Sequence, residues 1–173
     1  LVANHGIWPA EDVPIELMAE EQWRRTLAVN LDSVFGLVQA AVTQMELQGR
    51  GADNTAGHIV LISSTAGQRG EAHHADYAVT KGALISLTKS LSSELAPRGI
   101  RVNCVAPGWV ATEMSAAALG DPELGPRIAA SIPVGRVARA REIAGPVLFL
   151  CTPMAAFISG EVLNVNGGAV LAG

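Results

Sequence analysis

The feature of this chain that most constrains its fold is a regular alternation of short apolar segments with longer helical patterns. Residues 58–63 carry the clearest apolar segment, with Ile, Val, Leu and Ile in unbroken succession. Near-continuous apolar strands of this kind are typical of strands buried on both faces of a sheet. Because strands and helices alternate along the chain, the sequence predicts an α/β fold with a doubly wound parallel sheet and helices on both faces.

The expected elements follow one another without an internal repeat or a low-complexity linker, so residues 1–173 are interpreted as a single domain. Strands are expected at residues 1–3, 58–63, 100–105 and 161–165, and helices at residues 20–45, 75–95 and 141–150. The segments 67–76 and 114–132 are interpreted as loops that carry no decisive chemical group.

Composition narrows the class of protein. With 49% hydrophobic and 16% charged residues, the chain has the balance of one soluble globular domain. Its net charge of −4, with 12 scattered Lys and Arg residues, lacks the basic footprint of a protein that binds nucleic acid or an anionic membrane. No apolar run reaches the roughly 18 residues needed to cross a bilayer, and no signal peptide is recognisable. We therefore expect neither a nucleic-acid nor a membrane partner.

The cysteines and histidines give two further expectations. Cys104 and Cys151 both lie in apolar stretches, which suits reduced core thiols in a cytoplasmic protein better than a disulfide. The four histidines show no metal-ligand spacing with cysteines or carboxylates, so no metal site is expected.

Tyr77 and Lys81 are the first chemically informative pair. Tyr77 is the only tyrosine of the chain, and residues four apart on an amphipathic helix lie on one face, one turn apart. To exchange a proton at neutral pH, a phenol must have its pKa lowered from near 10 to about 7. A lysine ammonium at about 4 Å supplies roughly the 4 kcal/mol that this requires. A half-buried Tyr beside a solvated Lys has the same spacing, so the surroundings must decide.

Polar residues follow three of the expected strands where each strand ends. Asn4 follows the first strand, Ser64 the second, and residues 107–112 the third. In open parallel sheets the ligand lies beyond the carboxyl ends of the strands. Three loops that converge there with Tyr77 favour a catalytic site over a chance spacing.

Six segments together resemble those of a known family. They are Ala3-Asn4-His5-Gly6, Val29-Asn30-Leu31, Ile62-Ser63-Ser64, Tyr77 with Lys81, residues 101–108 and residues 164–168. On these motifs the chain resembles the short-chain dehydrogenase/reductase family, most of all its 3-oxoacyl-[acyl-carrier-protein] reductase branch. The resemblance extends over essentially the whole chain and implies the C-terminal part of a Rossmann-type fold.

The resemblance implies a catalytic role for four residues. Tyr77 would be the general acid that protonates the carbonyl oxygen in reduction, or the base in the reverse direction. Ser64 would donate a hydrogen bond to that oxygen. Lys81 would lower the pKa of Tyr77 and bond the ribose of the cofactor, while Asn30 would hold a water that relays protons to the lysine. Taken alone, Asn30 is equally compatible with a solvent-facing position in a helix.

The same resemblance implies that the cofactor is NAD or NADP. Gly6 would let the backbone approach it closely, and Asn4 would brace the sheet edge beside its adenosine. The Pro107-Gly108 turn would present the backbone of Val110 to the nicotinamide carboxamide, with Thr112 beside it. The expected cofactor-binding residues are Asn4, Gly6, Tyr77, Lys81, Pro107, Gly108, Val110 and Thr112.

Two departures from the family pattern stand out. His5 occupies a position where the family has a small residue. The glycine-rich phosphate loop, and the residue that chooses between NAD and NADP, would precede Leu1. We therefore expect that the N-terminal strand–helix units are missing and that these 173 residues alone do not turn over.

The expected function of the intact protein is the NAD(P)-dependent transfer of hydride between nicotinamide and a ketone or secondary alcohol, with a 3-oxoacyl thioester as one candidate substrate. Two alternatives stay open: a dehydrogenase of sugars, polyols or steroids within the same family, and a non-catalytic relative that keeps the fold for binding. A non-catalytic relative would be free to lose the four catalytic positions, and this chain has kept all of them.

The two longest expected helices are apolar over more of their circumference than one buried face needs. Val29, Leu37 and Ala40 extend the apolar surface of the first, and Ile85 extends that of the second. The resemblance implies that such helices pair with symmetry mates and that the tail, residues 169–173, lies near a further subunit boundary. We expect a homotetramer, or failing that a dimer; the alternative is that these residues complete a monomer core.

Overall fold

Four parallel strands form the centre of the fold in the computed structural model, which describes residues 1–171. The strands lie side by side in the order β1 (Val2–Ala3), β2 (Gly57–Ile62), β3 (Ile100–Pro107) and β6 (Val162–Val165). All three pairings are parallel, as the alternating sequence predicts, and Ile62 lies opposite Val105. The carboxyl ends of all four strands therefore share one edge of the sheet.

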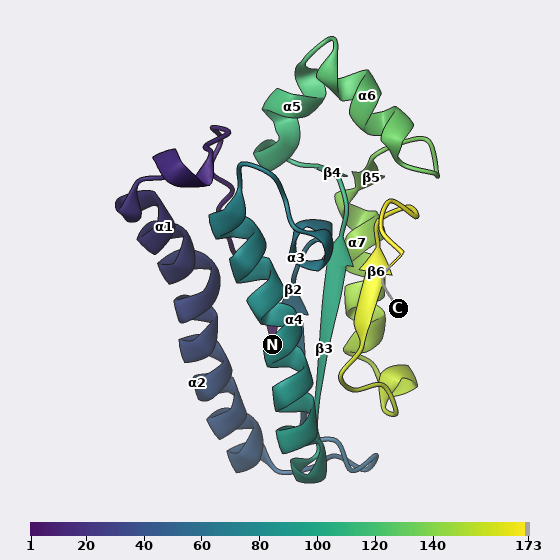
Figure 1. Ribbon diagram of the computed structural model, residues 1–173. Helices are drawn as coiled ribbons and strands as arrows, with labels where there is room; N and C mark the ends of the chain where they lie inside the picture. The colour runs from purple at the N-terminus through teal and green to yellow at the C-terminus, as the bar shows by residue number, and fades with distance from the viewer. Residues whose placement is uncertain (172–173) are drawn as a thin grey trace.

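Helices cover both faces of this sheet (Figure 1). On one face, α1 (Glu20–Leu27), the π-helical segment η2 (Ala28–Asp32) and α2 (Ser33–Gln48) form one continuous rod beside α4 (Ala75–Leu95). On the other face lies α7 (Ala140–Leu150). The prediction of an α/β fold with a doubly wound parallel sheet is confirmed, and the expected elements are displaced by no more than three residues at their ends.

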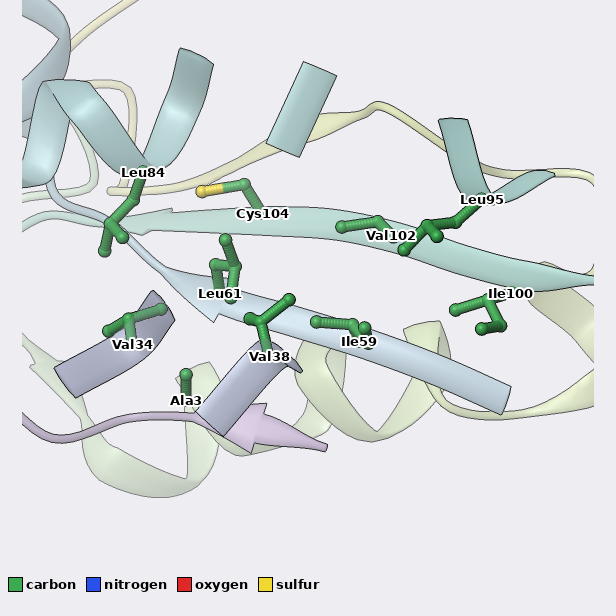
Figure 2. Close-up of a cluster of buried hydrophobic side chains, with 10 residues drawn as sticks. All are labelled: Ala3, Val34, Val38, Ile59, Leu61, Leu84, Leu95, Ile100, Val102 and Cys104. Atoms are coloured by element: carbon green, nitrogen blue, oxygen red, sulfur yellow. The ribbon is translucent and has the colours of Figure 1, made fainter. Parts of the chain in front are cut away.

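Strand residues alternate between two hydrophobic cores, because successive side chains of a strand point to opposite faces. Ile59 and Leu61 of β2 point toward α2 and α4, where Val34, Val38, Leu84 and Leu95 meet them (Figure 2). Val60 and Ile62 point the other way, toward Leu150 of α7. Each fully buried aliphatic side chain contributes about 1.5–3 kcal/mol to folding, so both helical layers are held to the sheet mainly by these contacts.

Helices occur in two segments where the sequence predicts loops, and that prediction was wrong. α3 (Thr65–Arg69) extends into the first segment as far as Arg69, and the second segment holds α5 (Ala116–Gly120) and α6 (Leu124–Ser131). α3 begins because the Ser64 hydroxyl accepts the Ala66 N–H at 3.1 Å, and α6 begins after Asp121, which accepts the N–H groups of Glu123 and Leu124. Such side-chain caps start helices that apolar periodicity alone does not reveal.

The remaining elements are short. Two strands, β4 (Val110–Ala111) and β5 (Ala138–Arg139), pair in a small separate sheet. Four 3-10 turns are η1 (Ile15–Leu17), η3 (Ala96–Arg98), η4 (Glu113–Ser115) and η5 (Pro153–Ala155). In Figure 1, α5 and α6 project beyond the carboxyl ends of the strands, so these two helices lie next to this edge of the sheet.

The rod of α1, η2 and α2 has an unusual surface. By length and composition alone the stretch Glu20–Gln48 is apolar enough to cross a bilayer, a test that core helices of soluble proteins also pass. Of the 18 consecutive residues with the highest mean hydropathy in this stretch, only 22% are buried. Val34 and Val38 pack inward, while Phe35 is 63% exposed. Much of its apolar surface is therefore uncovered within a single chain.

Candidate active site

The residues that the sequence singles out lie at the carboxyl edge of the sheet. Asn4 and Gly6 follow β1, Ser64 follows β2, and the segment 107–112 ends β3 and continues beyond it. Because Ile62 of β2 pairs with Val105 of β3, Ser64 is level with Pro107. α4 begins two residues before Tyr77, so its first turns rise from the same edge.

Lys81 is held with its ammonium group inside the protein. Its Nζ donates a hydrogen bond to the Ile62 carbonyl at 2.8 Å, and the side chain is 4% exposed. Burial lowers the pKa of Lys81 to about 8, since desolvation disfavours the charged form. The Ser63 hydroxyl donates to the Lys81 carbonyl at 2.7 Å, so Ser63 joins the end of β2 to α4.

Asn30 turns inward from the π-helical segment. Its Nδ2 donates to the Ile7 carbonyl at 2.9 Å, and its Oδ1 accepts the Ile7 N–H at 2.7 Å. A Cβ added at Gly6 would lie 3.3 Å from Asn30 Oδ1 and 3.4 Å from Lys81 Nζ, so these two polar groups border one small space beside Gly6. The solvent-facing alternative for Asn30 is wrong, because the residue is fully buried. Single π-turns inside α-helices occur frequently at functional sites.

Thr80 joins Asn30 to the tyrosine, and sequence reasoning missed it. Its hydroxyl donates to the Tyr77 carbonyl at 2.8 Å and accepts from Asn30 Nδ2 at 3.3 Å. The only signal in the sequence is a polar residue in the turn between Tyr77 and Lys81. That position is fully buried, so its hydroxyl needs the two partners that it has.

Tyr77 is buried beside Ser64 and Lys81. Burial raises the pKa of Tyr77, the side-chain hydrogen bond with Ser64 lowers it, and the charge of Glu71 raises it further. Lys81 Nζ lies 5.7 Å from the ring centroid and donates to Ile62. The pKa of Tyr77 is therefore raised overall, contrary to the expectation that Lys81 lowers it. The physical reason is that a partly desolvated lysine directed at a carbonyl does not offset the burial of the phenol.

The loop after β3 is fixed through its backbone. The Gly108 N–H donates to the Val165 carbonyl at 3.3 Å, and a Cβ at Gly108 would lie 3.0 Å from the Asn166 Cβ, so the close approach to β6 favours glycine. The Ser115 hydroxyl donates to the Val110 carbonyl at 2.5 Å and accepts the Thr112 N–H at 3.2 Å. These hydrogen bonds hold the backbone of residues 108–112 in a single conformation.

These groups fit a nicotinamide nucleotide. The absence of a side chain at Gly6 leaves a small space bordered by Asn30 and Lys81, and the buried ammonium of Lys81 provides donors there. His5 is exposed and its Nε2 contacts the Ser33 hydroxyl at 2.5 Å. Within residues 1–171, no group of three or more His, Cys, Asp or Glu side chains has an arrangement that would hold a metal ion.

Comparison with known sequences gives a consistent result. A family model described as enoyl-(acyl carrier protein) reductase matches residues 1–170. The chain is 42% identical over 168 residues to the 3-oxoacyl-[acyl-carrier-protein] reductase FabG of Escherichia coli K12. The aligned region covers 97% of this chain and 65% of that protein. It is 38% identical over 171 residues to L-rhamnose 1-dehydrogenase (NAD(P)(+)) of Azotobacter vinelandii, which covers 97% of this chain and 63% of that enzyme.

Solved structures agree with the sequence comparison. A short-chain dehydrogenase/reductase described as a glucose/ribitol dehydrogenase, from Brucella melitensis, has a TM-score of 0.87 and 37% identity, over 99% of this chain and 64% of that one. A gluconate 5-dehydrogenase from Burkholderia cenocepacia, in complex with NADP and tartrate, has a TM-score of 0.88 and 32% identity, over 97% of this chain and 63% of that one. The chain thus spans somewhat less than two thirds of the length of these relatives.

Proposed function

This chain belongs to the short-chain dehydrogenase/reductase family, and on that premise we propose that the whole protein is an NAD(P)-dependent oxidoreductase acting on a ketone or secondary alcohol. The observation that carries the proposal is the convergence of Asn30, Ser64, Tyr77 and Lys81 at the carboxyl edge of the sheet through the contacts described above. A non-catalytic relative would have no need of two buried polar groups and a buried phenol in one place.

Tyr77 is the proposed proton donor. When bound, NAD(P)H supplies the hydride for reduction. Because burial raises the pKa of Tyr77, its phenol stays protonated at neutral pH and can protonate the carbonyl oxygen as hydride arrives. Ser64 would donate a second hydrogen bond to the same oxygen, where negative charge develops. In the oxidative direction the phenolate form of Tyr77 would accept the proton of the alcohol, while Ser64 holds the oxygen.

Lys81 and Asn30 are proposed to hold the ribose and to pass protons. With a pKa of about 8, Lys81 is mostly cationic at neutral pH and can donate to ribose hydroxyls from its position beside Gly6. Asn30 holds the Ile7 backbone through two hydrogen bonds, and its amide group gives the space beside Gly6 a polar wall. The other residues proposed to bind the cofactor are Asn4, Gly6, Pro107, Gly108, Val110 and Thr112.

The substrate class has two candidates. The first is a 3-oxoacyl thioester, supported by the 42% identity to a protein named for that substrate. The second is a sugar or polyol, supported by structural relatives described as glucose/ribitol and gluconate 5-dehydrogenases. The decisive experiment is to assay the whole protein with NADH and with NADPH against both substrate classes and a steroid ketone. Absence of turnover on every substrate, with the cofactor bound, would favour a binding protein instead.

We also propose that the protein is a homotetramer in the cytoplasm. Between α2 and α4 runs a groove of about 560 Å³, lined mainly by Leu31, Phe35, Ala83 and Leu87. Phe35 in its lining is 63% exposed, and Val79, four residues before Ala83 on α4, is 48% exposed; Met154 and Phe157 in and after η5 are more exposed still. Apolar surface of this extent is typical of subunit interfaces.

A second copy of the chain, rather than lipid, is the proposed partner of the groove, because Asp32, Ser86 and Ser90 interrupt its apolar lining. Both cysteines are free, in keeping with a reducing compartment. Of the tail expected near a subunit boundary, Ala169 to Leu171 are described, whereas 172 and 173 lie outside the described residues. Light scattering of the whole protein at micromolar concentration tests the assembly, and a monomer mass would refute it.

A further inference from the structure

The loop after β1 reaches across to the start of α4 and places an aromatic ring against two residues there. The Trp8 ring lies on the His74 ring with 3.8 Å between centroids. It meets the Tyr77 ring edge-on, with 4.7 Å between centroids and 78° between planes. Edge-to-face aromatic pairs have a preferred geometry that restricts both rings. Trp8 is therefore a direct neighbour of the proposed proton donor.

His74 is held by a carboxylate from the same loop. Its Nε2 lies 2.9 Å from Asp12 Oδ1, and the residue is 4% exposed. An ionised carboxylate can only accept, so Nε2 carries the proton and the ring orientation is fixed. Among the described residues, Nδ1 has no hydrogen-bond partner although it is buried. A buried polar atom without a partner destabilises the fold and indicates a constraint other than stability.

The backbone at this point is also constrained. The Val13 N–H donates to the His73 carbonyl at 3.1 Å, which ties the loop to the residue before His74. His73 has a φ of 65°, a left-handed conformation that non-glycine residues rarely adopt. Such conformations persist where neighbouring contacts impose them, and they cluster at functional sites.

The first turn of α4 is fixed from its other side by α1. The buried Asp76 carboxylate accepts from the Thr26 hydroxyl at 2.8 Å, from Gln22 Nε2 at 3.2 Å and from the Tyr77 N–H at 2.9 Å. The backbone of Tyr77 is thus anchored, and rotation of its side chain is the freedom that remains. Four groups surround the phenol: Ser64, Glu71, Lys81 and Trp8.

We propose that Asp12, His74 and Trp8 form a positioning unit for Tyr77, in which the carboxylate orients the imidazole, the imidazole supports the indole, and the indole edge sets the phenol for proton transfer. This inference rests on the proposed function, since it takes Tyr77 as the proton donor. If Asp12 contributed only to the stability of the fold, loss of its carboxylate should have little effect. Its side chain is 78% exposed, and exposed ion pairs contribute little to stability.

The first test is Asp12→Ala in the whole protein, with Glu11→Ala as the matched control. Glu11 is an exposed carboxylate one residue away, so its loss changes the net charge equally without touching His74. Because small misplacements of reacting groups cost up to about a hundredfold in rate, Asp12→Ala should lower kcat about tenfold while KM for the cofactor stays constant. Asp12→Asn keeps an acceptor for His74 and should restore most of the rate. An unchanged kcat in Asp12→Ala overturns the proposal.

The second test reads the phenol directly. Phenolate absorbance is titrated in Trp8→Leu and Trp8→Phe, and the same titration of matched variants that also carry Tyr77→Phe is subtracted to isolate Tyr77. Since burial raises the pKa of Tyr77, loss of the indole in Trp8→Leu should admit water and lower that pKa, whereas Trp8→Phe should hold it near the parent value. A phenol titration that Trp8→Leu leaves unmoved overturns the proposal. Failure of the proposed function is distinguishable, because Tyr77→Phe would then keep full activity while the titration still responds to Trp8.

Discussion

The two sides of α4 contrast sharply. On its inner side the helix buries polar residues such as Asp76, Thr80 and Lys81, each with a hydrogen-bond partner in another part of the chain or in its own backbone. On its outer side, apolar Ala83 and Leu87 line an open groove. An ordinary surface helix has the opposite arrangement. The contrast agrees with the two proposals made above, a catalytic site on the inner side and a subunit interface on the outer side.

The energetics of the two sides differ for a simple reason. A buried donor or acceptor that loses its partner costs about 1–3 kcal/mol, so the inner side tolerates few changes. An apolar side chain on the surface of one subunit costs little until a partner covers it. Substitutions on the inner side should therefore act on catalysis and folding, whereas substitutions on the outer side should act on assembly.

The largest effect is expected for Tyr77→Phe. Loss of the hydroxyl removes the proposed general acid, and the chain has no other phenol to replace it. We expect kcat of the whole protein to fall at least about a hundredfold, with little change in cofactor affinity. Steady-state kinetics and a cofactor titration measure the two quantities, and near-normal turnover would sink the assignment.

The next largest effect concerns the contact between α3 and α4. A Cβ at Gly67 would lie 2.6 Å from the Lys81 carbonyl carbon, so Gly67→Ala must push the two helices apart. Overpacking of this kind costs about 1–3 kcal/mol. Gly36→Ala on the exposed side of α2 is the control, because its added Cβ meets nothing within 4 Å beyond its chain neighbours and its own helix backbone. Denaturant unfolding compares them, and equal stabilities would contradict the close packing of the inner side.

Lys81→Met tests the charge buried on the inner side. The folded-state pKa of Lys81 is lowered from 10.5 to about 8, so the unfolded chain binds more protons between these values and stability rises with pH across that window. Raising the pH from 8 to 9 should stabilise the parent by up to about 1 kcal/mol from this group, and Lys81→Met should lack that rise. Staying below pH 9 limits the opposing effect of Cys104, whose pKa burial raises to about 11.

The same variant has a functional readout. Loss of the ammonium beside Gly6 should weaken binding of NADH or NADPH, which a fluorescence titration measures. If Lys81→Met leaves both the cofactor affinity and the pH dependence of stability as they were, Lys81 belongs to the packing of α4 and not to the site.

The smallest effect on the fold of a subunit is expected on the outer side. Phe35 is 63% exposed beside the groove, so Phe35→Asp should change the stability of a single subunit by less than about 0.5 kcal/mol. It should nevertheless lower the mass measured by light scattering, because a carboxylate would enter the proposed interface. Leu17→Asp is the control, since Leu17 is also largely exposed, at 72%, on a different segment. A mass that falls equally in both variants would contradict the role of the groove.

Much of the fold was predictable because its signals are local. The apolar runs of β2 and β3 and the periodicity of α2 and α4 are properties of neighbouring residues. They predicted these elements and the edge of the sheet where the candidate site residues lie. The loops predicted near α3, α5 and α6 were wrong because short helices depend on caps such as Ser64 and Asp121 and on tertiary support.

The sequence by itself determined which chemical groups are available and in what order: a lone tyrosine, a lysine one helical turn later, and polar residues where strands end. Only the tertiary structure decided what surrounds them. Asn30 meets Ile7, Trp8 meets Tyr77, and Lys81 points at Ile62. The pKa of the phenol is raised rather than lowered for the same reason. Burial and electrostatic balance depend on segments far apart in the chain, and spacing along the chain carries no measure of either.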